Sequence, residues 1–186
     1  MRRLRTVPPL AIATLIACSV AGCLPLDPAP LPTIAPTGTP LFSSDEEALA
    51  AAEEAYAAYL AVSDQIAQEG GANPDRLAAY VTDEWLVNEV DAFTRLAETG
   101  RRQIGQTTFR NTALQQYEVS PMGESITVYA CLDFGATKFV DELGQDVSAP
   151  ERLTVATFEI QLAVSKDRTA QLLVSGSELW ETQSVC

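Results

Sequence analysis

The sequence contains no histidine among its 186 residues, and this absence removes a large part of enzyme chemistry. Without imidazole there is no histidine general base, no histidine metal ligand, and neither a Ser-His-Asp nor a Cys-His catalytic arrangement. Basic residues are scarce as well, because 12 Lys and Arg stand against 25 Asp and Glu and give a formal net charge of −13. Such a charge argues against nucleic-acid binding and against adhesion to anionic lipid through a basic surface.

An export signal is predicted at the N-terminus. Residues 10–20 form an apolar run that would rise only about 16 Å as a helix, roughly half of the hydrocarbon core of a bilayer. The run is typical of a signal peptide and too short for a membrane span. Three arginines lie within residues 2–5, and they leave open whether export uses the general secretory or the twin-arginine route.

A cysteine follows the apolar run directly. The segment Val20-Ala21-Gly22-Cys23 resembles a bacterial lipobox, which implies that Cys23 is acylated and becomes the mature N-terminus. Residues 1–22 would then be a lipoprotein signal peptide, and the alternative is an ordinary signal peptide with an accidental cysteine. Cleavage would remove three arginines and no acid, so the mature chain would carry 9 basic and 25 acidic side chains, a net charge of −16. The lipid would anchor it to the extracytoplasmic face of the cell membrane.

Residues 23–43 are expected to form a proline-rich linker. This stretch has too few apolar side chains for a core and favours extended backbone. A spacer between membrane and domain is the favoured interpretation, and a ligand for a proline-binding domain is the alternative. The prolines are Pro25, Pro28, Pro30, Pro32, Pro36 and Pro40.

Residues 44–186 are expected to form one domain, and its first part is helical. Ser44 and Glu47 have the spacing of a capping box, and a pair of glycines at 70–71 would end the helix that they begin. A short helix over residues 74–81 and a third helix from Thr82 to Gly100 are expected next. The buried face of the third helix is predicted to carry Trp85, Leu86, Val90, Phe93, Leu96 and Ala97.

Strand patterns fill the second half of the domain. Apolar and polar residues alternate there, which is typical of strands with one buried face. The expected extended segments are residues 106–119, 126–134, 137–140, 152–164 and 169–180. Helices followed by an antiparallel meander predict the α+β class.

Three short runs carry a resemblance to known proteins. The runs Ala-Tyr-Ala-Ala-Tyr-Leu at 55–60, Val-Tyr-Ala-Cys-Leu-Asp at 128–133 and Ser-Glu-Leu-Trp at 177–180 resemble lipoproteins of high-GC actinobacteria. These proteins are similar to the nuclear transport factor two-like, cystatin-like superfamily. The resemblance implies a cone-shaped domain, in which a curved antiparallel sheet wraps around N-terminal helices. That superfamily includes isomerases, cyclases, dehydratases and non-catalytic binding modules, so the fold does not select a function.

The cysteines predict one disulfide. Cys18 would leave with the signal peptide and Cys23 would be acylated, so Cys131 and Cys186 remain as two thiols in an exported protein. A bond between them would hold the C-terminal tail on a central strand. The alternative, a reactive or metal-binding thiol pair, lacks histidine and further cysteine ligands. No metal and no cofactor is expected.

Candidate site residues are few. Alternation points Asp133 and Glu159 away from the apolar sheet face, and only Glu178 can share that face, provided that no β-bulge intervenes. No catalytic residue is assigned, and Glu178 is the one candidate. Four aromatic residues could line an apolar ligand pocket, although packing in the core is the alternative for each. They are Tyr56, Tyr59, Trp85 and Trp180.

The sequence thus favours a membrane-anchored extracytoplasmic lipoprotein that presents a non-catalytic binding or assembly domain. The alternative is a small-molecule enzyme of the isomerase or cyclase type. Expected partners are the membrane, through Cys23, and a cell-envelope protein or a small apolar ligand, with no nucleic acid. The ligand and the oligomeric state stay open.

Overall fold

The computed structural model describes residues 39–165, 171–181 and 184–186. In this part of the chain, helices precede strands. The helices are α1 (Asp45–Gln68), the 3₁₀ helix η1 (Pro74–Ala79) and α2 (Asp83–Glu98), and the strands are β1 (Arg102–Ile104), β2 (Thr108–Ser120), β3 (Gly123–Asp133), β4 (Lys138–Val140), β5 (Val155–Val164) and β6 (Leu172–Leu179). None of these helices is long and apolar enough to cross a membrane. The predicted signal peptide and Cys23 lie outside the described residues.

Side-chain caps begin both long helices. The Ser44 hydroxyl accepts a hydrogen bond from the backbone N–H of Glu47 at 3.2 Å, as the capping-box spacing predicts. The Glu47 carboxylate, however, accepts from the backbone N–H of Ser43 at 2.8 Å, one residue earlier than in a capping box. Thr82 caps α2 in the same way, because its hydroxyl accepts from the N–H of Trp85 at 3.3 Å.

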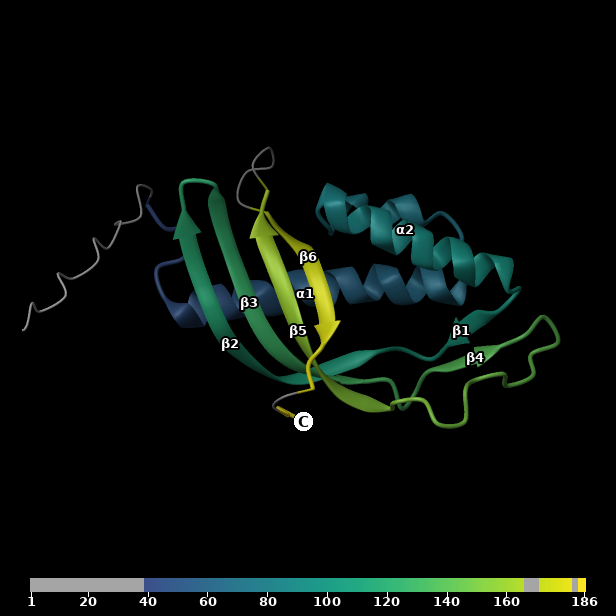
Figure 1. The fold of residues 1–186 in the computed structure, drawn as a ribbon. Helices are drawn as coiled ribbons and strands as arrows, with labels where there is room; N and C mark the ends of the chain where they lie inside the picture. Colours follow the sequence, from purple (N-terminus) through teal and green to yellow (C-terminus); the bar gives the residue numbers. More distant parts are fainter. Residues whose placement is uncertain (1–38, 166–170, 182–183) are drawn as a thin grey trace, which may run out of the picture. The chain divides into compact units, whose positions relative to one another are not determined.

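Four strands form the main antiparallel sheet in the order β2-β3-β5-β6, and β1 pairs with β4 in a separate two-stranded sheet. Helix α1 packs against β2, β3 and β6, and Figure 1 shows it crossing behind the strands of the main sheet, with β2 and β3 curving past it. The predicted α+β class is confirmed, with N-terminal helices packed against a four-stranded antiparallel sheet. Strand β1 was not predicted from the sequence.

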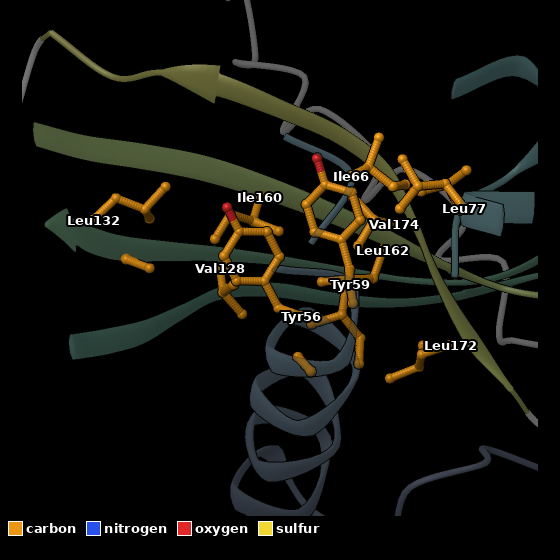
Figure 2. Packing of buried hydrophobic residues seen from close by; sticks show 14 of the residues in the cluster. Tyr56, Tyr59, Ile66, Leu77, Val128, Leu132, Ile160, Leu162, Leu172 and Val174 are labelled. Atoms are coloured by element: carbon orange, nitrogen blue, oxygen red, sulfur yellow. The ribbon is translucent and has the colours of Figure 1, made fainter. Parts of the chain in front are cut away.

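The core lies between α1 and one face of the main sheet. Figure 2 shows Tyr56 and Tyr59 reaching from α1 toward Val128 on β3 and Ile160 and Leu162 on β5. Both tyrosines are buried, with 1% and 6% of their surfaces exposed. Burial of these apolar surfaces supplies most of the stabilisation that holds the helix on the sheet.

Leu41 and Phe42, which the sequence analysis places in the proline-rich linker, contact the domain. The backbone N–H of Leu41 donates to the Glu124 carboxylate at 3.0 Å, and that of Phe42 donates to the Tyr117 hydroxyl at 3.2 Å. The rings of Phe42 and Tyr117 also meet edge to face, with centroids 5.6 Å apart. The contacts of the domain therefore begin before Ser44.

A disulfide joins Cys131 to Cys186, with Cα atoms 4.9 Å apart, as the sequence predicts. Two hydrogen bonds hold the same tail. The backbone N–H of Val185 donates to the Thr157 hydroxyl at 3.0 Å, and the Asn111 amide donates to the Val185 carbonyl at 3.1 Å. The tail therefore lies across the sheet face that is opposite to α1.

We expect Cys131→Ala and Cys186→Ala to lower the free energy of unfolding by a similar amount. The bond spans 55 residues, and closing such a loop contributes about 4 kcal/mol in the chain-entropy model. The double variant should be no less stable than the less stable single variant, because the bond is already lost. Urea denaturation of the three variants measures this, and two titratable thiols in the unfolded wild-type domain would contradict it.

Candidate functional site

A cavity of about 580 Å³ lies between α1, α2 and the main sheet. Its wall is mainly aromatic and apolar, with a small number of polar side chains, which is the usual composition of a small-molecule site. The two helices contribute Tyr56, Tyr59, Ser63, Asp64, Trp85, Glu89 and Phe93, and the strands and loops contribute Gln103, Leu132, Phe134, Phe139, Arg152, Phe158 and Ser177.

Backbone contacts at both ends hold α2 in place. Before the helix, the N–H of Thr82 donates to the carbonyl of Val174 on β6 at 2.9 Å, and the N–H of Val174 donates to Tyr80 at 2.9 Å. Farther along, Gly71 approaches α2 so closely that a Cβ atom there would meet the carbonyl oxygen of Phe93 at 2.2 Å. Gly71 also has φ +86°, so this position requires glycine on two grounds.

The cavity explains why α2 is less buried than its sequence pattern predicts. Of the six residues expected on its buried face, only Phe93 is fully buried. Trp85 and Leu96 pack against the core on one side and line the cavity, so they are half-buried. Leu86 and Val90 are half-buried outside the cavity, and the prediction of a buried Ala97 is wrong because Ala97 is exposed. Part of the apolar stripe of this helix therefore lines a pocket.

Glu89 is a carboxylate in the apolar part of this wall. The Tyr59 hydroxyl on α1 donates a hydrogen bond to Glu89 Oε1 at 2.8 Å. Burial raises the pKa of Glu89 above its ordinary value, while the Tyr59 and Trp85 side chains lower it to a smaller extent. The Trp85 side chain favours the charged form of Glu89. The buried Trp85 Nε1 nevertheless has no acceptor in hydrogen-bonding geometry.

Both tyrosines of α1 stay protonated. Burial and the neighbouring Glu89 carboxylate raise the pKa of Tyr59 well above its usual range, so Tyr59 acts as a hydrogen-bond donor. Burial raises the pKa of Tyr56 to about 12, and its hydroxyl lies 3.4 Å from Ser177 Oγ. The two rings are neighbours, with centroids 5.6 Å apart. The tyrosines thus present neutral aromatic surface to the cavity.

Asp64, the other carboxylate in the wall, has a structural role. It accepts hydrogen bonds from Gln103 Nε2 at 2.6 Å, from the backbone N–H of Thr107 at 2.7 Å and from the Thr107 hydroxyl at 3.0 Å. These bonds tie α1 to β1 and to the segment that enters β2. Because both of its oxygens already accept hydrogen bonds, Asp64 is poorly placed to serve a ligand.

Among the described residues of the wall, Arg152 is the one cationic side chain. Its guanidinium donates to the carbonyl of Phe134 at 3.0 Å and to the carbonyl of Thr137. Both acceptors belong to the connection between β3 and β4. The side chain therefore braces that connection through two of its donors.

A β-bulge in β6 decides where two predicted site residues lie. Gln161 pairs with Gly176 and Leu162 with Val174, so Ser175 is the extra residue. Residues after Ser175 therefore face the opposite side of the sheet from the side that simple alternation along β6 predicts. Ser177 lies opposite the buried Ile160 and faces the cavity.

The same bulge corrects the predictions for Glu178 and Trp180. Glu178 lies opposite Glu159 on the outer sheet face and is exposed, so it does not reach the cavity. Trp180 also lies on the outer face, where its ring stacks with Tyr129 at a centroid distance of 5.1 Å. Tyr56, Tyr59 and Trp85 do lie together in the cavity wall.

Sequence reasoning missed Glu89, although a signal was present. Trp85, Glu89 and Phe93 follow one another at four-residue spacing, so Glu89 falls within the apolar stripe of α2. A charged residue at such a position either packs badly or faces a polar or open site. Here it faces the cavity.

We expect Glu89→Gln to make the domain more stable at pH 7. A folded-state pKa above the unfolded value means that the folded protein loses stability as the pH rises from about 4 through the folded pKa. Glutamine stays neutral and retains an acceptor for Tyr59, so its advantage in melting temperature should shrink as the pH falls toward 4. Glu98→Gln, an exposed site on the same helix, controls for the change in net charge. A Glu89→Gln melting temperature below that of wild type at pH 7 would contradict this assignment.

Comparison with known proteins supplies a fold and no family. No protein-family model matches the sequence, and no curated protein matches it either. Among solved structures, the chain is similar to the intermembrane space region of the chloroplast protein ARC6, with a TM-score of 0.51 and 10% sequence identity. The match covers 70% of this chain and 95% of that chain. At this level of identity the likeness shows the fold alone: N-terminal helices packed against a four-stranded antiparallel sheet.

Proposed function

We propose that this domain binds a small, largely apolar molecule in the cavity between α1, α2 and the sheet, without catalysing its conversion. The observation that carries the proposal is an open cavity of about 580 Å³ with aromatic walls and one carboxylate that accepts a single described hydrogen bond. This volume lies within the roughly 300–1,000 Å³ typical of ligand pockets. A long helix on a curved sheet with a pocket between them also agrees with the resemblance to the nuclear transport factor two-like superfamily.

We further propose that the domain works outside the cytoplasm, anchored to the membrane through acylated Cys23. The support comes from the sequence of residues 1–23 and from the disulfide between Cys131 and Cys186. Disulfides persist mainly in oxidising compartments, so the bond agrees with export. The proline-rich residues 23–43 would act as a spacer between the lipid and the domain.

A second candidate function is proton transfer, of the kind that isomerases and cyclases perform. Glu89, rather than Glu178, is the observation that favours it, because a carboxylate with a raised pKa in an apolar pocket suits general acid–base chemistry. Such an enzyme also needs a donor for the developing oxyanion. Tyr59 donates to Glu89 itself, so the donor without a described acceptor in this wall is Trp85 Nε1. Binding without catalysis requires only the cavity and its apolar wall, so we propose it first.

Occlusion of the cavity tests the binding function. The neutral dye N-phenyl-1-naphthylamine should bind the full chain and fluoresce more strongly in the apolar cavity. Ala92→Phe places a ring in the cavity wall and should weaken dye binding by about tenfold, the effect of losing about 1.4 kcal/mol. Val87→Phe is the matched control, because Val87 lies on the same helix, outside the cavity, with 69% of its surface exposed. Equal dye binding by both variants, or no binding by wild type, would overturn the proposal.

The anchor is tested separately. Wild-type protein should be found in the membrane fraction and should incorporate a labelled fatty acid, whereas Cys23→Ser should do neither or should accumulate as an unprocessed precursor. The reason is that serine offers no thiol for acylation. Persistent labelling of the serine variant would show that the lipid is elsewhere.

A further inference from the structure

We propose that the cavity selects an organic cation, namely an amine or quaternary ammonium group on an apolar or aromatic body, with Glu89 as its counter-charge. This inference rests on the proposed binding function and adds the chemical class of the ligand. It depends on three features of the described wall: a carboxylate without an ion pair, neutral aromatic faces beside it, and a single cation, Arg152, that backbone carbonyls already engage.

The first feature is that Glu89 has no cationic partner. No ion pair of the described residues includes Glu89, and its one described hydrogen bond comes from the neutral Tyr59 hydroxyl. A partly buried carboxylate without a counter-charge is costly to maintain, and a bound cation would remove that cost. A neutral ligand would leave the charge of Glu89 uncompensated, and an anionic ligand would be repelled by it.

The second feature is the aromatic surface around the carboxylate. Tyr59 touches Glu89 directly, Tyr56 lies against Tyr59, and Trp85 precedes Glu89 by one helical turn. All three line the same cavity. The electron-rich faces of such rings attract cations, and ammonium groups enclosed by several rings gain the most. A carboxylate next to aromatic rings therefore suits a group that carries both positive charge and apolar surface.

The third feature is the state of Arg152, the one cation among the described residues of the wall. Two backbone carbonyls, those of Phe134 and Thr137, already accept hydrogen bonds from its guanidinium. Two of its five N–H donors are thus engaged, which leaves fewer for an incoming anion. The whole chain also has 25 acidic against 12 basic side chains, and an acidic protein raises the local concentration of cations at its clefts.

The test compares three probes of similar size by their displacement of N-phenyl-1-naphthylamine from the full chain. Benzyltrimethylammonium is the cation, neopentylbenzene is its neutral isostere, and phenylacetate is an anion. We expect the cation to bind about tenfold more tightly than the neutral isostere, and the anion to bind most weakly. Equal affinities of cation and isostere, or tighter binding of the anion, would overturn the inference while leaving the binding function in place.

Two variants assign the preference to Glu89. Glu89→Gln keeps the acceptor for Tyr59 and removes the charge, so it should weaken binding of the cation about tenfold and change that of the neutral isostere less than twofold. Glu98→Gln removes the same charge from an exposed site of α2 and should leave both affinities unchanged. If Glu89→Gln binds the cation as wild type does, the inference is wrong. If neither the dye nor any probe binds wild type, the binding function fails with it.

Discussion

The cavity depends on the way in which α2 is fixed at both ends. Hydrogen bonds to Val174 hold the chain just before α2 on the edge of β6, and the close approach of Gly71 to the Phe93 carbonyl sets the position of the helix farther along. Between these points Trp85 and Glu89 line the cavity. Burying apolar surface would otherwise draw α2 onto α1 and the sheet. The constraint keeps a pocket open where a packed core would form.

The two carboxylates in the cavity wall, Asp64 and Glu89, differ in how many hydrogen bonds they accept, and this difference distinguishes a structural role from a functional one. Asp64 accepts three hydrogen bonds and joins α1 to β1 and the entry of β2. Glu89 accepts one, from Tyr59, and burial raises its pKa. Fully bonded polar groups stabilise and position a fold, whereas a group with unused capacity in a cavity is available to a ligand. Glu89 therefore has more acceptor capacity left for a ligand than Asp64 has.

Much of the fold could be predicted because its determinants are local. The caps at Ser44 and Thr82, the periodicity of the helices and the alternation in β3 and β5 each lie within a few residues of sequence. The order of helices and strands then led to the α+β class. The pairing of Cys131 with Cys186 followed by elimination among four cysteines.

The site was less predictable because its determinants are not local. One extra residue, Ser175, reverses the direction of the residues after it. The neighbouring Gly176 is of a type that often marks a bulge, but it does not fix which residue is the extra one. Glu178 and Trp180 were therefore placed on the wrong face of the sheet. A helix face that lines a pocket also has the same apolar pattern as a helix face that is packed. The sequence of α2 consequently predicted a buried stripe instead of a wall, and Glu89 was passed over.

The docking of Leu41 and Phe42 has a consequence for how the domain is oriented. Leu41 contacts Glu124 and Phe42 contacts Tyr117, and these two partners lie on either side of the turn between β2 and β3. Leu41 and Phe42 therefore lie at the hairpin end of the main sheet. Strand β3 extends roughly 33 Å from the hairpin to its far end, and Leu132, close to that end, lines the cavity. A force applied to the domain at Leu41 would therefore act at one end of β3, whereas the cavity lies toward the other end.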